Sequence, residues 1–185
     1  MRLYRQTVED FGLYPGLELS EERMAELRES AGQMSAKMRA VRIVTASSVS
    51  RQDLEQRLVR KGEAPEQARA AVEWMADMNL VDDRQTARQI VERCVRQGYG
   101  IARAKQMLYE KRIPKEFWDE VLEDYPDQTE SISAYLTEHL DETSDRREIK
   151  RVVDALIRKG HSYSTIRKCL RQMDFDGSEA REEWL

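Results

Sequence analysis

The sequence predicts an all-α protein: an elongated, curved array of three tandem three-helix repeats behind a short N-terminal lead. Apolar residues recur at helical spacing through most of the chain. Helix caps and turn residues interrupt that pattern at regular places. In addition, residues 83–113 match residues 145–175 without a gap at an offset of 62 positions, which is typical of an internal repeat.

The repeat match includes helix caps and turn residues as well as apolar residues. Asp83 falls on Asp145 and Gly98 on Gly160, whereas a first copy aligns at an offset near 50 and places Ser50 on Gly100. Chance similarity between amphipathic helices is the alternative, and it does not account for matching caps. The expected segments are an acidic lead (1–32), repeat one (33–82), repeat two (83–127), a connecting helix (128–144) and repeat three (145–185).

The lead is expected to be peripheral. It carries four bases against seven acids, and Gly12 and Pro15 with Gly16 indicate turns. Ser20 is followed by two glutamates, whose charge suits a helix N-terminus, and so predicts a short helix through Leu27.

Repeat one should begin with a helix within residues 34–47. The inward-facing residues expected on this helix are Met38, Val41 and Val44. Ser50, with Asp53 three residues later, predicts the N-terminus of the second helix. Gly62 should end that helix, and Pro65 should open the third helix from its first turn.

Repeat two should begin at Asp83 as an N-cap, with Asp82 and Asp83 joining it to repeat one. The expected buried stripe of its first helix is Ala87, Ile90, Val91, Cys94 and Val95. Gly98 should end that helix, Gly100 should start the second, and Pro114 should start the third.

The connecting helix should span residues 129–141, and Asp145 should open repeat three with Glu148 at the capping-box position. The expected buried stripe of the next helix is Ile149, Val152, Val153, Leu156 and Ile157. Gly160 should end it, and either Ser162 or Ser164 should cap the helix that follows.

Charge alternates with the same period. Residues 37–62 carry a net +5, whereas residues 84–115 and 146–171 each carry +7, in a chain of net charge -4. The three third-helix stretches are acidic instead. Stacked repeats could align the basic helices into one binding face, with the acidic helices on another side; ordinary solvated faces are the alternative. The candidate binding residues are Arg88, Arg96, Arg103, Lys105, Lys111, Arg112, Lys150, Arg151, Arg158, Arg167 and Lys168.

No catalytic or metal-binding constellation is predicted. The sequence has no phosphate-binding Gly-rich loop, and His139 and His161 lack Cys or carboxylate partners at metal spacing. Cys94 and Cys169 fall at core positions, which predicts buried thiols and a reducing, cytoplasmic compartment. The apolar runs are too short to span a membrane, and the N-terminus lacks the apolar region of a signal peptide.

Four stretches resemble motifs of the RecX family and follow them in order. They are residues 50–62 (S-x-x-E-L-x-x-K-L-x-x-K-G in the family), 79–87 (G-L-L-D-D-x-x-F/Y-A), 98–113 (G-x-G-P-x-R-I-x-x-E-L-x-x-K-G-I) and 156–166 (L-x-R-R-G-F-x-x-x-x-I). Residues 12–20 also resemble the lead of longer members, which have a small β segment before it. The sequence departs from the family pattern at four places: Thr86 replaces an aromatic residue, Ala104 replaces Ile, Arg112 replaces Gly, and Gln106 with Met107 replaces the usual acidic residue before Leu108.

The resemblance implies a non-enzymatic regulator of the RecA recombinase, active in homologous recombination, DNA repair and the SOS response. Family members lie in the groove of the RecA–DNA filament and usually inhibit its growth, ATP hydrolysis, strand exchange and repressor cleavage. The implied partners are therefore RecA and, non-specifically, DNA phosphates. The chain is expected to be a monomer without a cofactor. A direct DNA-binding protein, with a helix-turn-helix around residues 98–100, and a helical interaction scaffold are the alternatives.

Overall fold

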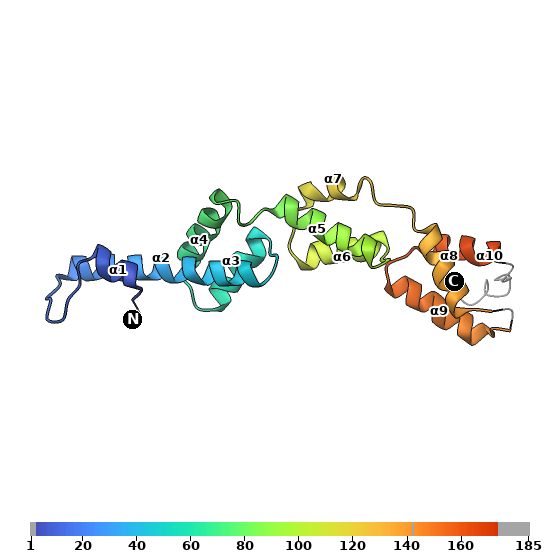
Figure 1. Cartoon of the computed structure of the whole chain (residues 1–185), viewed down its shortest axis with the longest axis horizontal. Helices are drawn as coiled ribbons and strands as arrows, with labels where there is room; N and C mark the ends of the chain where they lie inside the picture. Colours follow the sequence, from blue (N-terminus) through green and yellow to red (C-terminus); the bar gives the residue numbers. More distant parts are fainter. Residues whose placement is uncertain (1–2, 142, 174–185) are drawn as a thin grey trace. The chain divides into compact units, whose positions relative to one another are not determined.

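The computed structural model describes residues 3–141 and 143–173, and all regular structure in those ranges is helical, as predicted (Figure 1). The chain divides into an N-terminal unit, residues 1–86 with 111–113, and a C-terminal unit, residues 87–110 with 114–185. The helices are α1 (Arg5–Asp10), α2 (Glu21–Ala46), α3 (Arg51–Arg60), α4 (Pro65–Asp77), α5 (Asp83–Arg96), α6 (Ile101–Glu110), the 3₁₀ helix η1 (Lys115–Phe117), α7 (Trp118–Leu122), α8 (Thr129–His139), α9 (Arg146–Arg158) and α10 (Tyr163–Gln172).

The N-terminal unit is built on α2, a single helix of 26 residues. It begins as expected at Ser20, whose hydroxyl accepts a hydrogen bond from the Arg23 N–H at 3.2 Å. The sequence predicts two helices here, and the structure joins them, so the expected boundary at residue 32 falls inside α2. Gly32 weakens a helix by only about 1 kcal/mol relative to alanine, and the burial of Ala31 and Ala36 on either side of the boundary favours continuity.

The predicted face of α2 is confirmed only in part: Val41 and Val44 are partly buried and pack against the core, but they are not its most buried residues. Ala36, Ala40 and Ile43 are buried, whereas Met38 is 36% exposed. They share a core with alanines of α4, which packs along α2 (Figure 1). Small side chains allow two helices to approach closely, and in this unit the interface between α2 and α4 is formed largely by alanines. The buried residues of this core are Ala36, Ala40, Ile43, Val49, Leu54, Leu58, Ala68, Ala71, Val72, Met75 and Val81.

The predicted caps of α3 and α4 are confirmed. The Ser50 hydroxyl accepts a hydrogen bond from the Asp53 N–H at 3.1 Å. Gly62, with φ 93°, provides the left-handed residue that ends α3. Pro65 occupies the first turn of α4, where its missing N–H costs nothing.

In the C-terminal unit, four of the five residues of the predicted α5 stripe, Ala87, Ile90, Val91 and Cys94, are buried, and the fifth, Val95, is half-buried. The third helix of repeat two is shorter than a regular helix, because η1 precedes the five residues of α7. Pro114 stands before η1, as expected for a proline that opens a helical segment.

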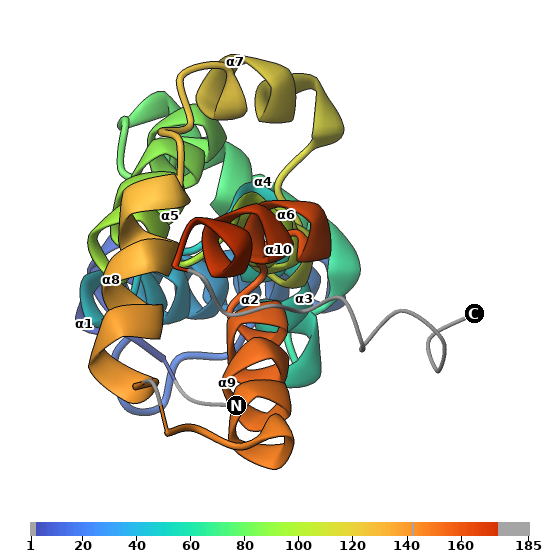
Figure 2. The same ribbon diagram turned by 90° about the vertical axis from the view of Figure 1, so that its right-hand side faces the viewer.

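The second core of the C-terminal unit is formed by α8, α9 and α10, which lie together in Figure 2. Its buried residues are Ile132, Leu136, Leu140, Val152, Leu156, Ile166, Cys169 and Leu170. The helix expected to be a connection therefore contributes directly to this core. Asp145 and Glu148 form the predicted capping box and Ser162 caps α10, but Ile157 is 44% exposed rather than buried. The third helix expected in residues 174–185 lies outside the described residues.

Candidate functional site

The predicted basic residues are mostly at the surface. Exposed members are Arg88, Arg96, Lys105, Arg112, Lys150, Arg151, Arg158 and Lys168. Arg103, Lys111 and Arg167 are half-buried. The structure therefore places all eleven where at least part of the side chain meets solvent.

Acidic side chains pair with some of these bases. Within the C-terminal unit, the Arg88 guanidinium lies 2.6 Å from the Glu120 carboxylate of α7, and Arg103 lies 3.7 Å from Glu110. Within the N-terminal unit, Arg39 lies 2.7 Å from Glu63. The basic and acidic stretches are therefore not wholly segregated. The Arg88–Glu120 and Arg103–Glu110 pairs meet solvent and contribute at most about 1 kcal/mol each; Glu63 of the third pair is buried.

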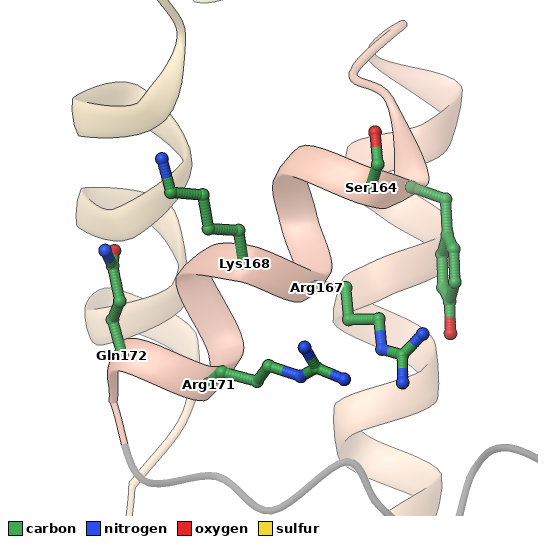
Figure 3. Close-up of a pocket in the computed structure, with 6 residues that line it drawn as sticks. Ser164, Arg167, Lys168, Arg171 and Gln172 are labelled. Atoms are coloured by element: carbon green, nitrogen blue, oxygen red, sulfur yellow. The ribbon is translucent and has the colours of Figure 1, made fainter.

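A pocket on α10 brings two of the predicted bases together (Figure 3). Its six lining residues, which define the α10 pocket, are Tyr163, Ser164, Arg167, Lys168, Arg171 and Gln172. Figure 3 shows the guanidinium groups of Arg167 and Arg171 on one side of the helix, with Lys168 and Gln172 on the other. Among the described residues, the lining holds three bases and no acid.

The sequence did not single out Tyr163, Arg171 or Gln172, and it named Ser164 only as an alternative helix cap. The signal was helical spacing: residues 163, 167 and 171 form one i,i+4 row, and residues 164, 168 and 172 form the next. These rows become readable once Ser162 is placed as the cap, because its hydroxyl accepts from the Thr165 N–H at 3.1 Å.

The Asp127 carboxylate lies within electrostatic reach of Lys168 in the α10 pocket. The pKa of Asp127 is lowered by hydrogen bonds from the Thr129 hydroxyl and N–H, at 2.8 and 3.0 Å, and further by the charge of Lys168. Asp127 therefore stays ionised, but it is not among the lining residues.

Ser50, a residue predicted to be structural, makes a second kind of contact in the N-terminal unit. Its hydroxyl, besides capping α3, donates a hydrogen bond to the Lys111 carbonyl at 2.6 Å. The Arg51 N–H donates to the Asp83 carboxylate at 2.8 Å. We call these four residues the Ser50 junction. Ser50 is fully buried, so both of its bonds are shielded from water.

The prediction that Asp83 caps α5 is wrong. Asp82 is the cap, because its carboxylate accepts from the Arg84 and Gln85 N–H groups at 2.8 and 3.1 Å. Asp83 is instead 8% exposed and accepts from Arg51 at the start of α3. The two adjacent aspartates thus divide the tasks that the sequence assigned to both: one caps a helix and the other holds the Ser50 junction.

Gly100 and Gly160, both predicted at helix ends, contact one another within the C-terminal unit. The Gly100 N–H donates to the Lys159 carbonyl at 2.9 Å, and the Ala102 N–H donates to the Gly160 carbonyl at 3.3 Å. A Cβ on Gly100 would collide with the Gly160 backbone, and a Cβ on Gly160 would collide with Arg103. We call this contact of residues 98–103 with residues 159–161 the Gly100 junction.

His161 completes the Gly100 junction. Its Nε2 lies 3.0 Å from the Gly98 carbonyl, and because a carbonyl only accepts, Nε2 carries the proton. Its Nδ1 is buried without a hydrogen-bond partner. Burial lowers the pKa of His161, the bond to Gly98 opposes that shift, and Lys159 adds to it. The ring is therefore held in the neutral form.

Tyr125 makes a further contact with the turn at residues 98–100. Its hydroxyl donates to the Tyr99 carbonyl at 2.6 Å. Burial, followed by the nearby Cys94, raises the pKa of Tyr125 to about 12. The hydroxyl therefore remains a donor across the physiological pH range.

Both cysteines are buried and free, as predicted. Burial raises the pKa of the Cys94 thiol, against the opposing charges of Arg103 and Arg93, and the thiol lies 3.4 Å from the Met107 sulfur. Among the described residues, no group of three or more His, Cys, Asp or Glu side chains could hold a metal ion. In the same part of the chain, no helix is both long and apolar enough to cross a membrane.

Known proteins resemble this chain over most of its length. The family model of the RecX second three-helix domain matches residues 82–122. The regulatory protein RecX of Vibrio campbellii is 26% identical over 146 residues, which cover 77% of this chain and 94% of the relative. The regulatory protein RecX of Clostridioides difficile is 25% identical over 181 residues, covering 94% of this chain and 85% of the relative.

Solved structures show the same fold. A crystal structure of regulatory protein RecX superposes with a TM-score of 0.68 at 20% identity and covers 90% of this chain and 86% of its own. A crystal structure of RecX from Lactobacillus salivarius gives a TM-score of 0.67 at 18% identity, covering 79% and 99%. The domain model, the curated relatives and the shared fold agree, and together they confirm the similarity of this chain to the RecX regulatory proteins.

Proposed function

We propose that this chain is a non-catalytic cytoplasmic regulator that binds the RecA–DNA filament in its groove. Its action is to modulate, and in the main to inhibit, the ATPase, recombinase and coprotease activities of that filament. Two findings support the proposal: curated relatives carry the name regulatory protein RecX, and the tandem three-helix architecture matches RecX structures.

The observation that carries the proposal is the placement of positive charge in an acidic chain. The net charge is -4, yet basic side chains populate the exposed surface of α5, α6, α9 and α10. A filament groove exposes both protein and phosphate, so such a surface can meet phosphates there without sequence preference and with strong dependence on salt.

The proposal is tested by adding the chain to RecA on single-stranded DNA and following ATP turnover. Sub-stoichiometric amounts should change the rate, and the effect should weaken as salt rises. No change at any ratio would overturn the proposal. Tight, sequence-specific duplex binding without RecA would favour the direct DNA-binding alternative. If the chain showed neither duplex binding nor an effect on ATP turnover, the helical interaction scaffold would be the remaining alternative.

Charge variants sharpen this test. Replacing Arg96, Lys105 and Lys150 by alanine should reduce the effect on ATP turnover several-fold, because all three are exposed. Replacing Arg5, which pairs with Glu9 at 2.7 Å, is the control and should leave the effect unchanged. Circular dichroism should show the same helicity in every variant.

A further inference from the structure

We propose that the α10 pocket is a site for a short single-stranded nucleic-acid segment, with phosphates on Arg167, Lys168 and Arg171 and a base stacked on Tyr163. This inference rests on the proposed function, because it names the part of the basic surface that meets the nucleic acid. It also assigns roles to Tyr163 and Arg171, which sequence reasoning did not select.

The charge of the pocket favours a polyanion. Three of its six lining residues are bases, and two of these are arginines whose side chains extend from the same side of α10 (Figure 3). A guanidinium presents a planar fork of donors that suits phosphate oxygens. Asp127, whose pKa the charge of Lys168 helps to lower, lies near this charge but does not line the pocket.

Tyr163 favours nucleic acid over an acidic protein segment. Arginine forks bind carboxylates as well as phosphates, so the bases alone do not decide between them. An aromatic ring in the same pocket favours nucleic acid, because proteins that bind single strands typically combine basic groups with aromatic side chains on which bases stack. Tyr163 is 48% exposed and lines the pocket, so its ring is accessible.

The geometry favours a single strand. The bases of a duplex are stacked on one another and present only their edges, so a lone tyrosine gains nothing from them. From residue 163 to residue 171 the helix rises about 12 Å, which matches roughly three stacked nucleotides at about 3.4 Å each. Ser164 and Gln172 add neutral hydrogen-bonding groups at the two ends of the pocket.

The test measures binding of a fluorescent oligo-dT strand, and of a duplex of equal length, to the full chain without recombinase. Arg167→Ala/Lys168→Ala/Arg171→Ala should weaken oligo-dT binding at least tenfold and reduce the salt slope by about 2, at about 0.7 per phosphate contact. The control Arg28→Ala/Arg42→Ala/Arg60→Ala removes equal charge from exposed positions and should weaken binding less than threefold. Equal losses in the two variants would mean a net-charge effect and would overturn the assignment.

Tyr163 variants test the stacking separately. Tyr163→Leu should weaken oligo-dT binding at least fivefold and leave duplex binding unchanged, whereas Tyr163→Phe should bind like the unaltered chain. Equal effects of Tyr163→Leu on strand and duplex, or no effect on either, would contradict a stacked base. Displacement of oligo-dT by a poly-glutamate peptide at lower concentration than by dT itself would assign the pocket to an acidic protein segment instead.

Failure of this inference is distinguishable from failure of the proposed function. If the unaltered chain changes RecA ATP turnover but the pocket variants bind oligo-dT normally, the pocket assignment alone is wrong. If the chain leaves ATP turnover unchanged but the pocket variants lose oligo-dT binding, the pocket stands and the filament proposal falls.

Discussion

The Ser50 junction and the Gly100 junction each connect the start of a helix to a segment distant in the sequence, but they do so with opposite chemistry. Ser50 and Gly100 align in the repeat and both precede a second helix, α3 or α6. Ser50 uses its hydroxyl to cap its helix and to bind the Lys111 carbonyl. Gly100 has no side chain, and its backbone instead meets the backbone of residues 159 and 160.

This difference teaches that equal positions in a repeat need not carry equal roles. The Ser50 junction depends on a side-chain group that a substitution can remove. The Gly100 junction depends on the absence of side chains, so a substitution damages it by adding atoms. Opposite kinds of mutation should therefore disrupt the two junctions.

The largest effect is expected from Gly100→Ala. Its new Cβ would collide with backbone atoms of Gly160 and His161, which cannot rotate away as a side chain can. We expect a loss of about 3 kcal/mol in the free energy of unfolding, at the upper end for overpacking, measured by urea denaturation.

Gly98→Ala is the matched control for that experiment. Gly98 has φ 63° but nothing within 4 Å of an added Cβ, so only the left-handed backbone is penalised, by about 1–2 kcal/mol. Equal losses in the two variants would show that close backbone approach at Gly100 contributes nothing.

Ser50→Ala should break the other junction, with a loss of about 2 kcal/mol. The substitution removes a helix cap and leaves the Lys111 carbonyl without the hydroxyl that donates to it at a buried position. Ser162→Ala is the control, because Ser162 caps α10 at an exposed position and should cost only about 1 kcal/mol. Thermal or urea unfolding compares the two, and a larger loss from Ser162→Ala would contradict the role of the Ser50 junction.

Arg112→Gly should stabilise the chain by about 1 kcal/mol. Arg112 follows the Ser50 junction at Lys111 and has φ 56°, a left-handed conformation that glycine adopts at no steric cost. Asn79→Gly is the comparison at φ 55°, and its gain should be smaller because asparagine tolerates this region. A destabilised Arg112→Gly chain in urea denaturation would mean that the arginine makes contacts that outweigh its backbone strain.

The smallest effect is a dependence on pH at the Gly100 junction. The lowered pKa of His161 means that the unfolded chain takes up its proton first as the solution is acidified. The contribution of His161 to stability is therefore complete above about pH 6.5 and is lost progressively at lower pH.

Urea midpoints at pH 7.5 and 5.5 measure this loss. His161→Gln can still donate to the Gly98 carbonyl but does not titrate, so its midpoint should fall less between the two pH values. An identical fall in both chains would assign the whole pH effect to other groups.

The sequence predicted the elements well where caps and apolar spacing agreed. The Asp145–Glu148 capping box, the Gly62 and Gly98 helix ends and the α5 stripe all lie where the pattern placed them. The RecX motifs gave the family resemblance for the same reason, since those motifs consist largely of caps, turns and core positions.

The prediction was wrong where small residues carried the packing. A hydrophobicity pattern assigns little weight to alanine, so it chose Met38 over Ala36 and Ala40 on α2. It also treated Gly32 as a boundary, although burial on both sides of it keeps the helix continuous.

The candidate site could be predicted only in part from the sequence, because much of it depends on contacts between residues far apart in the chain. Net charge identified the basic stretches, but which bases pair with acids depends on tertiary contacts such as Arg88 with Glu120. The α10 pocket needed the register of one helix, and the Gly100 junction needed contacts about sixty positions apart in the chain.

The continuity of α2 has a consequence for how the N-terminal unit opens. At 1.5 Å per residue its 26 residues extend about 39 Å, from the acidic lead into the first core. Helix propagation is cooperative, so the two ends of such a helix should unfold as one foldon. In native-state hydrogen exchange, the amides of Leu27 and Ala40 should therefore share one opening free energy, although the sequence assigns them to separate segments.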